Sequence, residues 1–143
     1  MNEIEIHNKL SEQIIGSAIE VHKILGPGLL ESAYELCLAR ELALRNIEFE
    51  IQKPMPIVYK GSFLDCGYRL DIVVGGLIIV ELKSVDVILA IHKAQIVSNL
   101  KLSGLKLGLL LNFNVEKMKN GIYRFVNHLE EPIRSLGPQR PLV

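Results

Sequence analysis

The sequence predicts an α/β fold in which a mixed central sheet is flanked by helices. Two observations lead to this prediction. Near-continuous apolar runs are typical of strands that are covered on both faces, and segments with helical periodicity lie before and between these runs. The resulting order, α-α-β-β-β-α-β with a short final strand, suits helices packed on a sheet. A length of 143 residues fits one domain; we expect it to span residues 1–130, followed by a loose tail at 131–143.

The helices are predicted from apolar residues that recur every three or four positions. The first covers about residues 8–24 and ends where Gly26-Pro27-Gly28 breaks the pattern. The second covers residues 30–45. The third covers residues 86–102, and Gly104 is its expected stop.

The strands are predicted from apolar segments bounded by turn residues. The segment 49–59 holds Pro54 and Pro56, which favours an edge strand. Gly75-Gly76 is a strong signal for a hairpin. The remaining expected strands are 64–74 and 77–83 on either side of these glycines, then 106–112, and a short one at 121–126.

Composition narrows the class of protein. With 16 basic and 16 acidic residues the net charge is zero, which argues against a strong non-specific binder of nucleic acid. Two cysteines, Cys37 and Cys66, are too few for a disulfide scaffold or a cysteine-rich zinc site. The acidic start does not resemble a signal peptide, and no apolar run reaches membrane-spanning length. We therefore expect a reduced, cytoplasmic protein.

The apolar content is high for such a protein. The mean hydropathy is +0.28, and apolar residues make up 49% of the chain. Some apolar surface is therefore expected to be covered by a partner subunit, which favours a homodimer.

Charged residues at the ends of buried strands are the candidates for chemistry. Glu81 and Lys83 are two positions apart, so their side chains share one face of a strand. Asp71 lies on the preceding strand, across the hairpin. Charges next to an apolar strand are costly unless they are paired or used.

The register of the hairpin decides whether Asp71 and Glu81 meet. A two-residue loop at 75–76 would pair residue 71 with residue 80, and the two carboxylates would point to opposite faces. A three-residue loop at 75–77, or a bulge near the turn, would place Asp71 opposite Glu81. A shared site therefore requires an odd loop or a bulge.

Two converging carboxylates call for a cation, and all-oxygen ligation suits Mg²⁺ or Mn²⁺. Such an ion polarises a phosphoryl oxygen and lowers the pKa of a bound water. Lys83 could orient that water or offset charge on the phosphate. On spacing alone, a surface ion pair at a strand end is the more frequent explanation of a Glu-x-Lys pattern.

The spacing Asp71…Glu81-Leu82-Lys83 resembles the D-x(n)-(D/E)-x-K signature of the PD-(D/E)XK nuclease superfamily, with Leu70 in place of the proline. The stretch 28–34, Gly-Leu-Leu-Glu-Ser-Ala-Tyr, resembles the motif of the GxxExxY family within that superfamily. The resemblance implies a restriction-endonuclease-like αβββαβ core with an extra N-terminal helix. It also implies Mg²⁺-dependent hydrolysis of phosphodiester bonds, with DNA favoured over RNA, and a metal held by Asp71, Glu81 and the Leu82 carbonyl.

The resemblance adds two further site residues. Glu31 would complete the metal shell, directly or through water, although a carboxylate in the first turn of a helix is also stabilised by the helix dipole alone. Gln95 is a candidate site residue because related exonucleases carry Q-x-x-x-Y on this helix; a surface amide is an equal alternative. Asn99 stands where those exonucleases have tyrosine. For Tyr34, three residues after Glu31, packing is the favoured role.

Two other classes of function stay open at this point. The chain could be a non-catalytic, nuclease-like module that binds nucleic acid or a protein partner, which its small size and Asn99 favour. It could also be a structural dimerising domain, which its apolar content favours.

Overall fold

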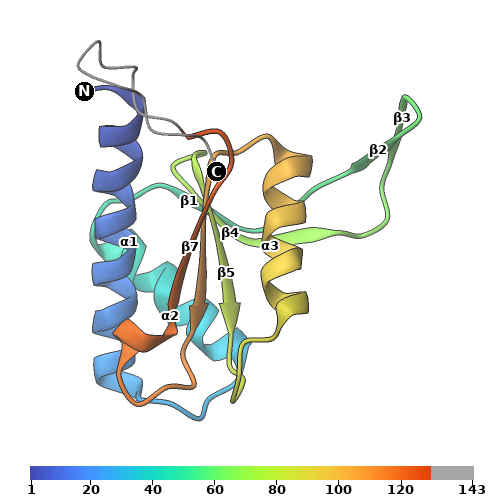
Figure 1. Cartoon of the computed structure of the whole chain (residues 1–143). Coiled ribbons are helices and arrows are strands. Elements are labelled where there is room, and N and C mark those ends of the chain that lie inside the picture. The colour runs from blue at the N-terminus through green and yellow to red at the C-terminus, as the bar shows by residue number, and fades with distance from the viewer. Residues whose placement is uncertain (130–143) are drawn as a thin grey trace, which may run out of the picture.

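The computed structural model describes residues 1–129, and the tail expected at 131–143 lies outside these residues. Within them the chain forms the elements drawn in Figure 1. The helices are α1 (Glu3–Leu25), α2 (Glu31–Leu44) and α3 (Ala90–Ser103), with a 3-10 turn η1 (Met118–Gly121). The strands are β1 (Phe49–Pro54), β2 (Ile57–Tyr59), β3 (Ser62–Leu64), β4 (Arg69–Val74), β5 (Ile78–Lys83), β6 (Leu107–Asn112) and β7 (Ile122–Val126).

A mixed sheet forms the centre of the described part of the chain. Its strand order is β1-β4-β5-β6-β7. Only the β5–β6 pair within this sheet is parallel, and α3 makes the crossover between these two strands. Helices α1 and α2 cover one face and α3 covers the other (Figure 1). The predicted α/β class with a mixed, helix-flanked sheet is therefore confirmed.

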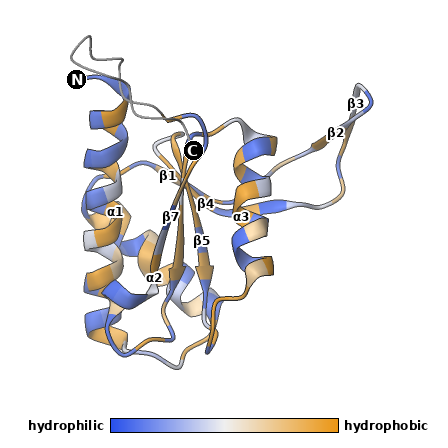
Figure 2. Ribbon diagram, in the orientation of Figure 1, coloured by the Kyte–Doolittle hydropathy of each residue, from blue (hydrophilic) through white to orange (hydrophobic). Residues whose placement is uncertain are grey.

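The core lies on both faces of the sheet, where apolar residues (orange in Figure 2) are concentrated. The larger cluster joins α1 and α2 to the sheet and includes the buried Ile72, Val80 and Leu82. The smaller cluster lies under α3 and includes Val73 and Ile79. Strand β6 is buried along its whole length, as expected for a strand with both faces covered.

The prediction of one edge strand over 49–59 is wrong in its extent. β1 is an edge strand, but it ends at Pro54, and the chain then leaves the sheet. Pro56 has no N–H to donate to a strand ladder, which helps to end the pairing there. Residues 57–64 instead form the β2–β3 hairpin, which projects from the body as an arm (Figure 1). The predicted strand 64–74 is correspondingly shortened to β4.

Two helices begin at positions other than those predicted. Helix α1 starts five residues before residue 8 because the Asn2 side chain caps it and accepts a hydrogen bond from the Glu5 N–H at 2.9 Å. Helix α3 starts at Ala90 instead of residue 86. Asn112 holds the preceding loop, since its amide exchanges two hydrogen bonds with the Val85 backbone. No helix in residues 1–129 combines the length and the apolar character needed to cross a membrane.

Gly108 lets α3 approach the sheet closely. A Cβ at this position on β6 would lie 2.9 Å from Ile96 Cδ1 and 3.3 Å from Leu100 Cδ1, both on α3. With any larger residue, the Ile96 side chain or the helix itself would have to shift. Gly108 thus allows Ile96 and Leu100 of α3 to lie directly against β6.

We expect Gly108→Val to destabilise the protein by about 1–3 kcal/mol because it overpacks the contact with Ile96. Chemical denaturation measures this loss. Adding Ile96→Ala to the Gly108→Val variant should cost less than Ile96→Ala costs in the wild type, since the truncation makes room for the new methyl groups. Additive losses would show that the two residues do not compete for space.

Candidate active site

The hairpin between β4 and β5 has a three-residue loop. The paired residues are Val74 with Ile78, Val73 with Ile79 and Ile72 with Val80. Residues 75–77 form the turn, closed by a hydrogen bond of 3.0 Å from the Leu77 N–H to the Val74 carbonyl. Gly75 and Gly76 both have positive φ, at 60° and 67°, which glycine adopts without strain. This register places residue 71 opposite residue 81, on the face covered by α3.

The two strands separate at this point. Ile72 and Val80 are the last pair of the ladder, and beyond them the Asp71 carboxylate accepts a hydrogen bond of 2.9 Å from the Leu82 N–H. A side chain thus satisfies a buried donor that the ladder leaves free. On the other side, Gln52 of β1 has a positive φ of 50° and makes no bridge to Asp71. Asp71 is therefore fixed by its own bond to β5.

The side chain of Asp71 lies near that of Glu81, close enough for its charge and its hydrogen bonding to perturb Glu81. Burial, and then the charge of Asp71, raise the pKa of Glu81 from its ordinary 4.5 to about 9. The hydrogen bond from Asn99 and the charge of Lys83 act in the opposite direction and do not prevail. Without a cation, Glu81 is therefore protonated near neutral pH.

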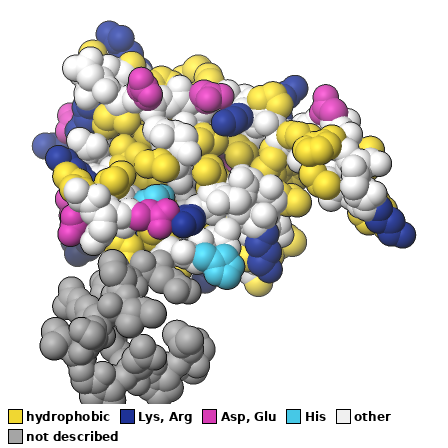
Figure 3. All heavy atoms as spheres, turned by 90° about the horizontal axis from the view of Figure 1, so that it is seen from above, with side chains coloured by type: hydrophobic (Ala, Val, Ile, Leu, Met, Phe, Trp, Pro, Cys, Tyr) yellow, Lys and Arg dark blue, Asp and Glu magenta, His cyan; other side chains and the backbone are white. Residues whose placement is uncertain are grey.

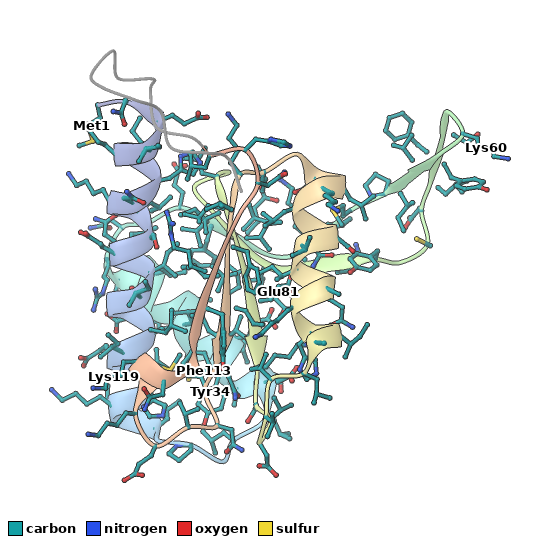
Figure 4. All side chains as sticks on the ribbon, in the orientation of Figure 1. Met1, Tyr34, Lys60, Glu81, Phe113 and Lys119 are labelled. Atoms are coloured by element: carbon teal, nitrogen blue, oxygen red, sulfur yellow. The ribbon has the colours of Figure 1, made fainter. Side chains whose placement is uncertain are left out.

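Glu81 and Lys83 line a small cleft between the sheet and α3, and Figure 4 shows Glu81 there. The cleft has a volume of about 60 Å³, which holds an ion and a few waters but no nucleotide. Asp71 is not part of the lining. The other residues that line the cleft are Tyr68, Arg69, His92, Gln95, Ile96, Asn99 and Leu110.

Two of the lining residues are joined to Glu81 by hydrogen bonds. The Asn99 side-chain N–H donates to Glu81 Oε1 at 3.1 Å, and the Tyr68 hydroxyl donates to Asn99 Oδ1 at 2.6 Å. Asn99 is only 3% exposed. Gln95, one turn earlier on α3, is exposed at the mouth of the cleft and makes no side-chain hydrogen bond within residues 1–129.

His92 is the remaining polar residue of α3 in the cleft, and a hydrogen bond to the backbone at the start of α3 holds its ring. The Leu89 N–H donates to His92 Nδ1 at 2.9 Å. Since a backbone N–H can only donate, Nδ1 must accept, and the neutral ring carries its proton on Nε2. His92 thus offers the cleft a donor rather than an acceptor.

Glu31 occupies a different hollow, at the start of α2. Its carboxylate accepts a hydrogen bond of 3.3 Å from the Ser84 N–H, one residue beyond Lys83. This hollow is lined by Leu29, Leu30, Ser32 and Ser84 as well as Glu31. The structure therefore brings Glu31 to the end of β5 but not into the cleft that Glu81 lines.

Glu35, one turn after Glu31, is a carboxylate that the sequence analysis did not single out. Burial raises the pKa of Glu35, the charge of Asp71 raises it further, and the hydrogen bonds from Gln52 lower it. Gln52 donates to both Glu35 oxygens at 3.0 Å. Glu35 therefore lies within electrostatic reach of Asp71, a proximity that no spacing in the sequence indicates.

Tyr34 packs, as expected, and also holds the turn before α2. Its ring stacks on Phe113 with centroids 4.5 Å apart, and both are labelled in Figure 4. Its hydroxyl donates to the Gly26 carbonyl at 2.6 Å and accepts from the Leu29 N–H at 3.2 Å. Tyr34 thereby fixes the loop from which Glu31 begins.

The structure thus groups some of the predicted site residues and not others. Asp71, Glu81 and Lys83 come together, Gln95 lies at the mouth of their cleft, and Glu31 lies apart. In residues 1–129, no group of three or more His, Cys, Asp or Glu side chains is arranged to hold a metal ion. Tyr68 was missed, because nothing in the sequence links it to a helix residue 31 positions away.

The raised pKa of Glu81 predicts how stability depends on pH in the metal-free protein. Between about pH 5 and 9 the folded state keeps a proton on Glu81 that the unfolded state releases, so stability falls as the pH rises. The slope should approach, at most, about 1.4 kcal/mol per pH unit. Denaturation in EDTA across this range measures it.

Glu81→Gln should flatten this pH dependence and stabilise the metal-free protein at pH 8, since an amide is neutral beside Asp71 without the proton that folding must otherwise keep on Glu81. Glu12→Gln is the matched control, because Glu12 is exposed on α1 and its loss should leave the slope unchanged. Equal slopes for wild type and Glu81→Gln would contradict the assignment of the proton to Glu81.

Comparisons with known proteins agree with this geometry. Residues 8–125 match the family model of the PD-(D/E)XK nuclease superfamily. Neither a search of curated proteins nor a search of solved structures finds a match. The five-stranded mixed sheet flanked by helices in residues 1–129 is consistent with a restriction-endonuclease-like fold. The matched segment covers most of the chain and includes all the residues that line the cleft, so the chain belongs to the PD-(D/E)XK nuclease superfamily.

Proposed function

We propose that this protein is a Mg²⁺- or Mn²⁺-dependent nuclease that hydrolyses phosphodiester bonds, with DNA as its substrate. Within the superfamily we assign it to the GxxExxY group, on Gly28, Glu31 and Tyr34. The observation that carries the proposal is that the Asp71 and Glu81 carboxyl groups lie near each other, beside Lys83. The choice of DNA over RNA rests on the likeness to the superfamily alone.

The residues present fit a divalent cation. Two carboxyl groups held near each other repel, and one of them keeps a proton as a result. A cation would take the place of that proton and let both groups ionise. Asp71, Glu81 and the Leu82 carbonyl would hold it, an all-oxygen set of the kind that Mg²⁺ and Mn²⁺ prefer. When bound, the ion supplies a Lewis acid for the phosphoryl group and a water of lowered pKa.

Lys83 is proposed to serve the phosphate. It shares the cleft with Glu81, and its ammonium group can hold the attacking water or offset the charge that develops on the phosphoryl oxygens. Arg69 is exposed at the rim of the same cleft and can contact a neighbouring phosphate. Because the cleft is too small for a nucleotide, the substrate would lie across its mouth, with only the scissile phosphate near Lys83.

Gln95 and Glu31 are given lesser roles. Gln95 is exposed at the mouth, where its amide can bind the substrate backbone. Glu31 accepts the Ser84 N–H next to Lys83, so it supports the end of β5 and would act on the ion through water rather than directly. Its loss should therefore cost less activity than the loss of Asp71.

A non-catalytic module that binds nucleic acid or a protein is the second candidate. The separation of Glu31 from the carboxyl pair favours it, because a two-carboxylate site can bind an ion without completing an active site. Such a protein would bind the ion and the nucleic acid and cut neither DNA nor RNA.

We also propose that the protein is a homodimer. Apolar side chains are exposed on α1 and α2, including Ile24 at 70% and Leu36 at 64%. They border a hollow of about 270 Å³ that is lined mainly by apolar side chains. Covering this surface would remove apolar area from water, as subunit contacts do.

The proposed activity predicts a ranking among variants. Against linear and circular DNA with Mg²⁺ or Mn²⁺, Asp71→Asn and Lys83→Ala should each lower kcat by about 100-fold or more, in line with the loss of a group that stabilises the transition state. Glu31→Gln should lower it less. Lys60→Ala, at the tip of the arm (labelled in Figure 4), is the control and should retain wild-type activity.

Circular dichroism and melting curves establish that each variant is folded before rates are compared. A wild type that binds Mn²⁺ but cuts no form of DNA or RNA would favour the binding module. Equal activity in wild type and Asp71→Asn would contradict the proposed role of the carboxyl pair.

A further inference from the structure

Glu81 depends for its position on two uncharged residues that come from outside β5. Asn99 of α3 donates to Glu81 Oε1 at 3.1 Å, and Tyr68, just before β4, donates to Asn99 Oδ1 at 2.6 Å. Three segments far apart in the sequence are thus joined by two consecutive hydrogen bonds. Both bonds lie at the edge of the cleft that Glu81 and Lys83 line.

The order of donors in this chain of bonds is fixed when Glu81 is ionised. An amide has a donor end and an acceptor end, and the two are told apart by their partners. When the Tyr68 hydroxyl donates to Asn99 Oδ1, the amide must present its N–H groups to Glu81. An ionised carboxylate can only accept, so this orientation is the one that suits Glu81 as a ligand of a cation.

Asn99 has little freedom to turn away. Its side chain is buried, at 3% exposed, and in residues 1–129 no buried side-chain polar atom is left without a partner. Rotating the amide would break its bonds to both neighbours and leave buried groups unsatisfied, which is costly. The backbone of α3 is itself held close to the sheet at Gly108.

Tyr68 is anchored at the base of the projecting arm. Its carbonyl accepts a hydrogen bond of 2.9 Å from the N–H of the buried Met55, which closes the loop of chain that contains β2 and β3. Tyr68 also packs against the apolar cluster under α3. The Tyr68 hydroxyl therefore reaches Asn99 from a fixed position. The arm beyond Tyr68 carries exposed apolar side chains (yellow at the right of Figure 3), among them Val58 and Phe63.

We propose that Asn99, oriented by Tyr68, positions the Glu81 carboxylate for cation binding; this inference rests on the proposed function. Neither residue touches the ion or the phosphate, so both are positioning residues. Tyr68, the residue before β4, does not bond to Glu81 itself; its hydroxyl acts on Glu81 through the Asn99 amide. The exposed Gln95 has no part in holding Glu81.

Titration calorimetry of Mn²⁺ binding to the purified 143-residue protein tests the proposal. Asn99→Leu should weaken Mn²⁺ binding by about tenfold or more, as the loss of a residue that orients a metal ligand does. Tyr68→Phe removes only one oxygen and should weaken binding by about fivefold, the effect of one hydrogen bond. Tyr59→Phe, which removes an exposed hydroxyl on the arm, should bind Mn²⁺ as the wild type does.

Kinetics provide a second readout that mere destabilisation would not change. In both variants the Mn²⁺ concentration for half-maximal cleavage should rise by the same factor as the dissociation constant, and saturating Mn²⁺ should restore most of kcat. KM for DNA should stay unchanged. In the Asn99→Leu background, Tyr68→Phe should have no further effect, since Tyr68 acts only through Asn99.

The outcomes separate this inference from the proposed function. If the wild type binds Mn²⁺ and cuts DNA while Tyr68→Phe and Asn99→Leu bind Mn²⁺ with unchanged affinity, the positioning role is wrong and the proposed function stands. If the two substitutions act additively, Tyr68 does not work through Asn99. If the wild type binds no Mn²⁺, the proposed function fails and this inference fails with it.

Discussion

The closeness of the carboxyl groups of Asp71 and Glu81 is the constraint on which the rest of the site depends. Two such groups in a partly dry cleft cannot both ionise at low cost, which is why burial and Asp71 together raise the pKa of Glu81. A folded protein that keeps the two groups this close gives up some stability in its metal-free form. That cost has a physical explanation if a divalent cation relieves the repulsion, and it has no evident one if the pair is merely structural.

The fold produces this arrangement through a few local features. The three-residue turn at 75–77 sets the register that puts the two carboxyl groups on one face. The bond from Leu82 N–H to Asp71 opens the ladder where the cleft begins. Gly108 lets α3 come close enough for Asn99 to reach Glu81. Each feature depends on backbone geometry, which brings the side chains that hold the site to fixed positions.

Periodicity and apolar runs were sufficient to predict the α/β class, the mixed sheet and most of its strands, since burial on both faces leaves a clear pattern. The arm was missed because a hairpin outside the sheet has the same composition as an edge strand, and Pro56 alone does not show where the chain departs. The pairing of Asp71 with Glu81 was left open, because two loop lengths fit Gly75-Gly76 and each sends residue 71 to a different face.

The long-range contacts could not be predicted from one sequence. Glu31 belongs to a recognisable motif, yet its carboxylate bonds to the Ser84 N–H and does not lie in the cleft that Glu81 lines. Asn99 seemed to be only a departure from the tyrosine of related exonucleases, yet it is the residue that bonds to Glu81. Tyr68 has no motif, and its role depends on how the arm returns to the sheet. Residues that position others are selected by tertiary geometry, and their spacing in the sequence carries no signal.

A crystal structure of the wild-type protein soaked in Mn²⁺, with anomalous difference maps, tests the central claim most directly. The account predicts one anomalous peak within about 2.5 Å of a carboxylate oxygen of both Asp71 and Glu81, the range of metal–oxygen bonds in proteins. The contradicting result is a map that shows Mn²⁺ bound at other places on the molecule but no peak between the carboxyl groups of Asp71 and Glu81.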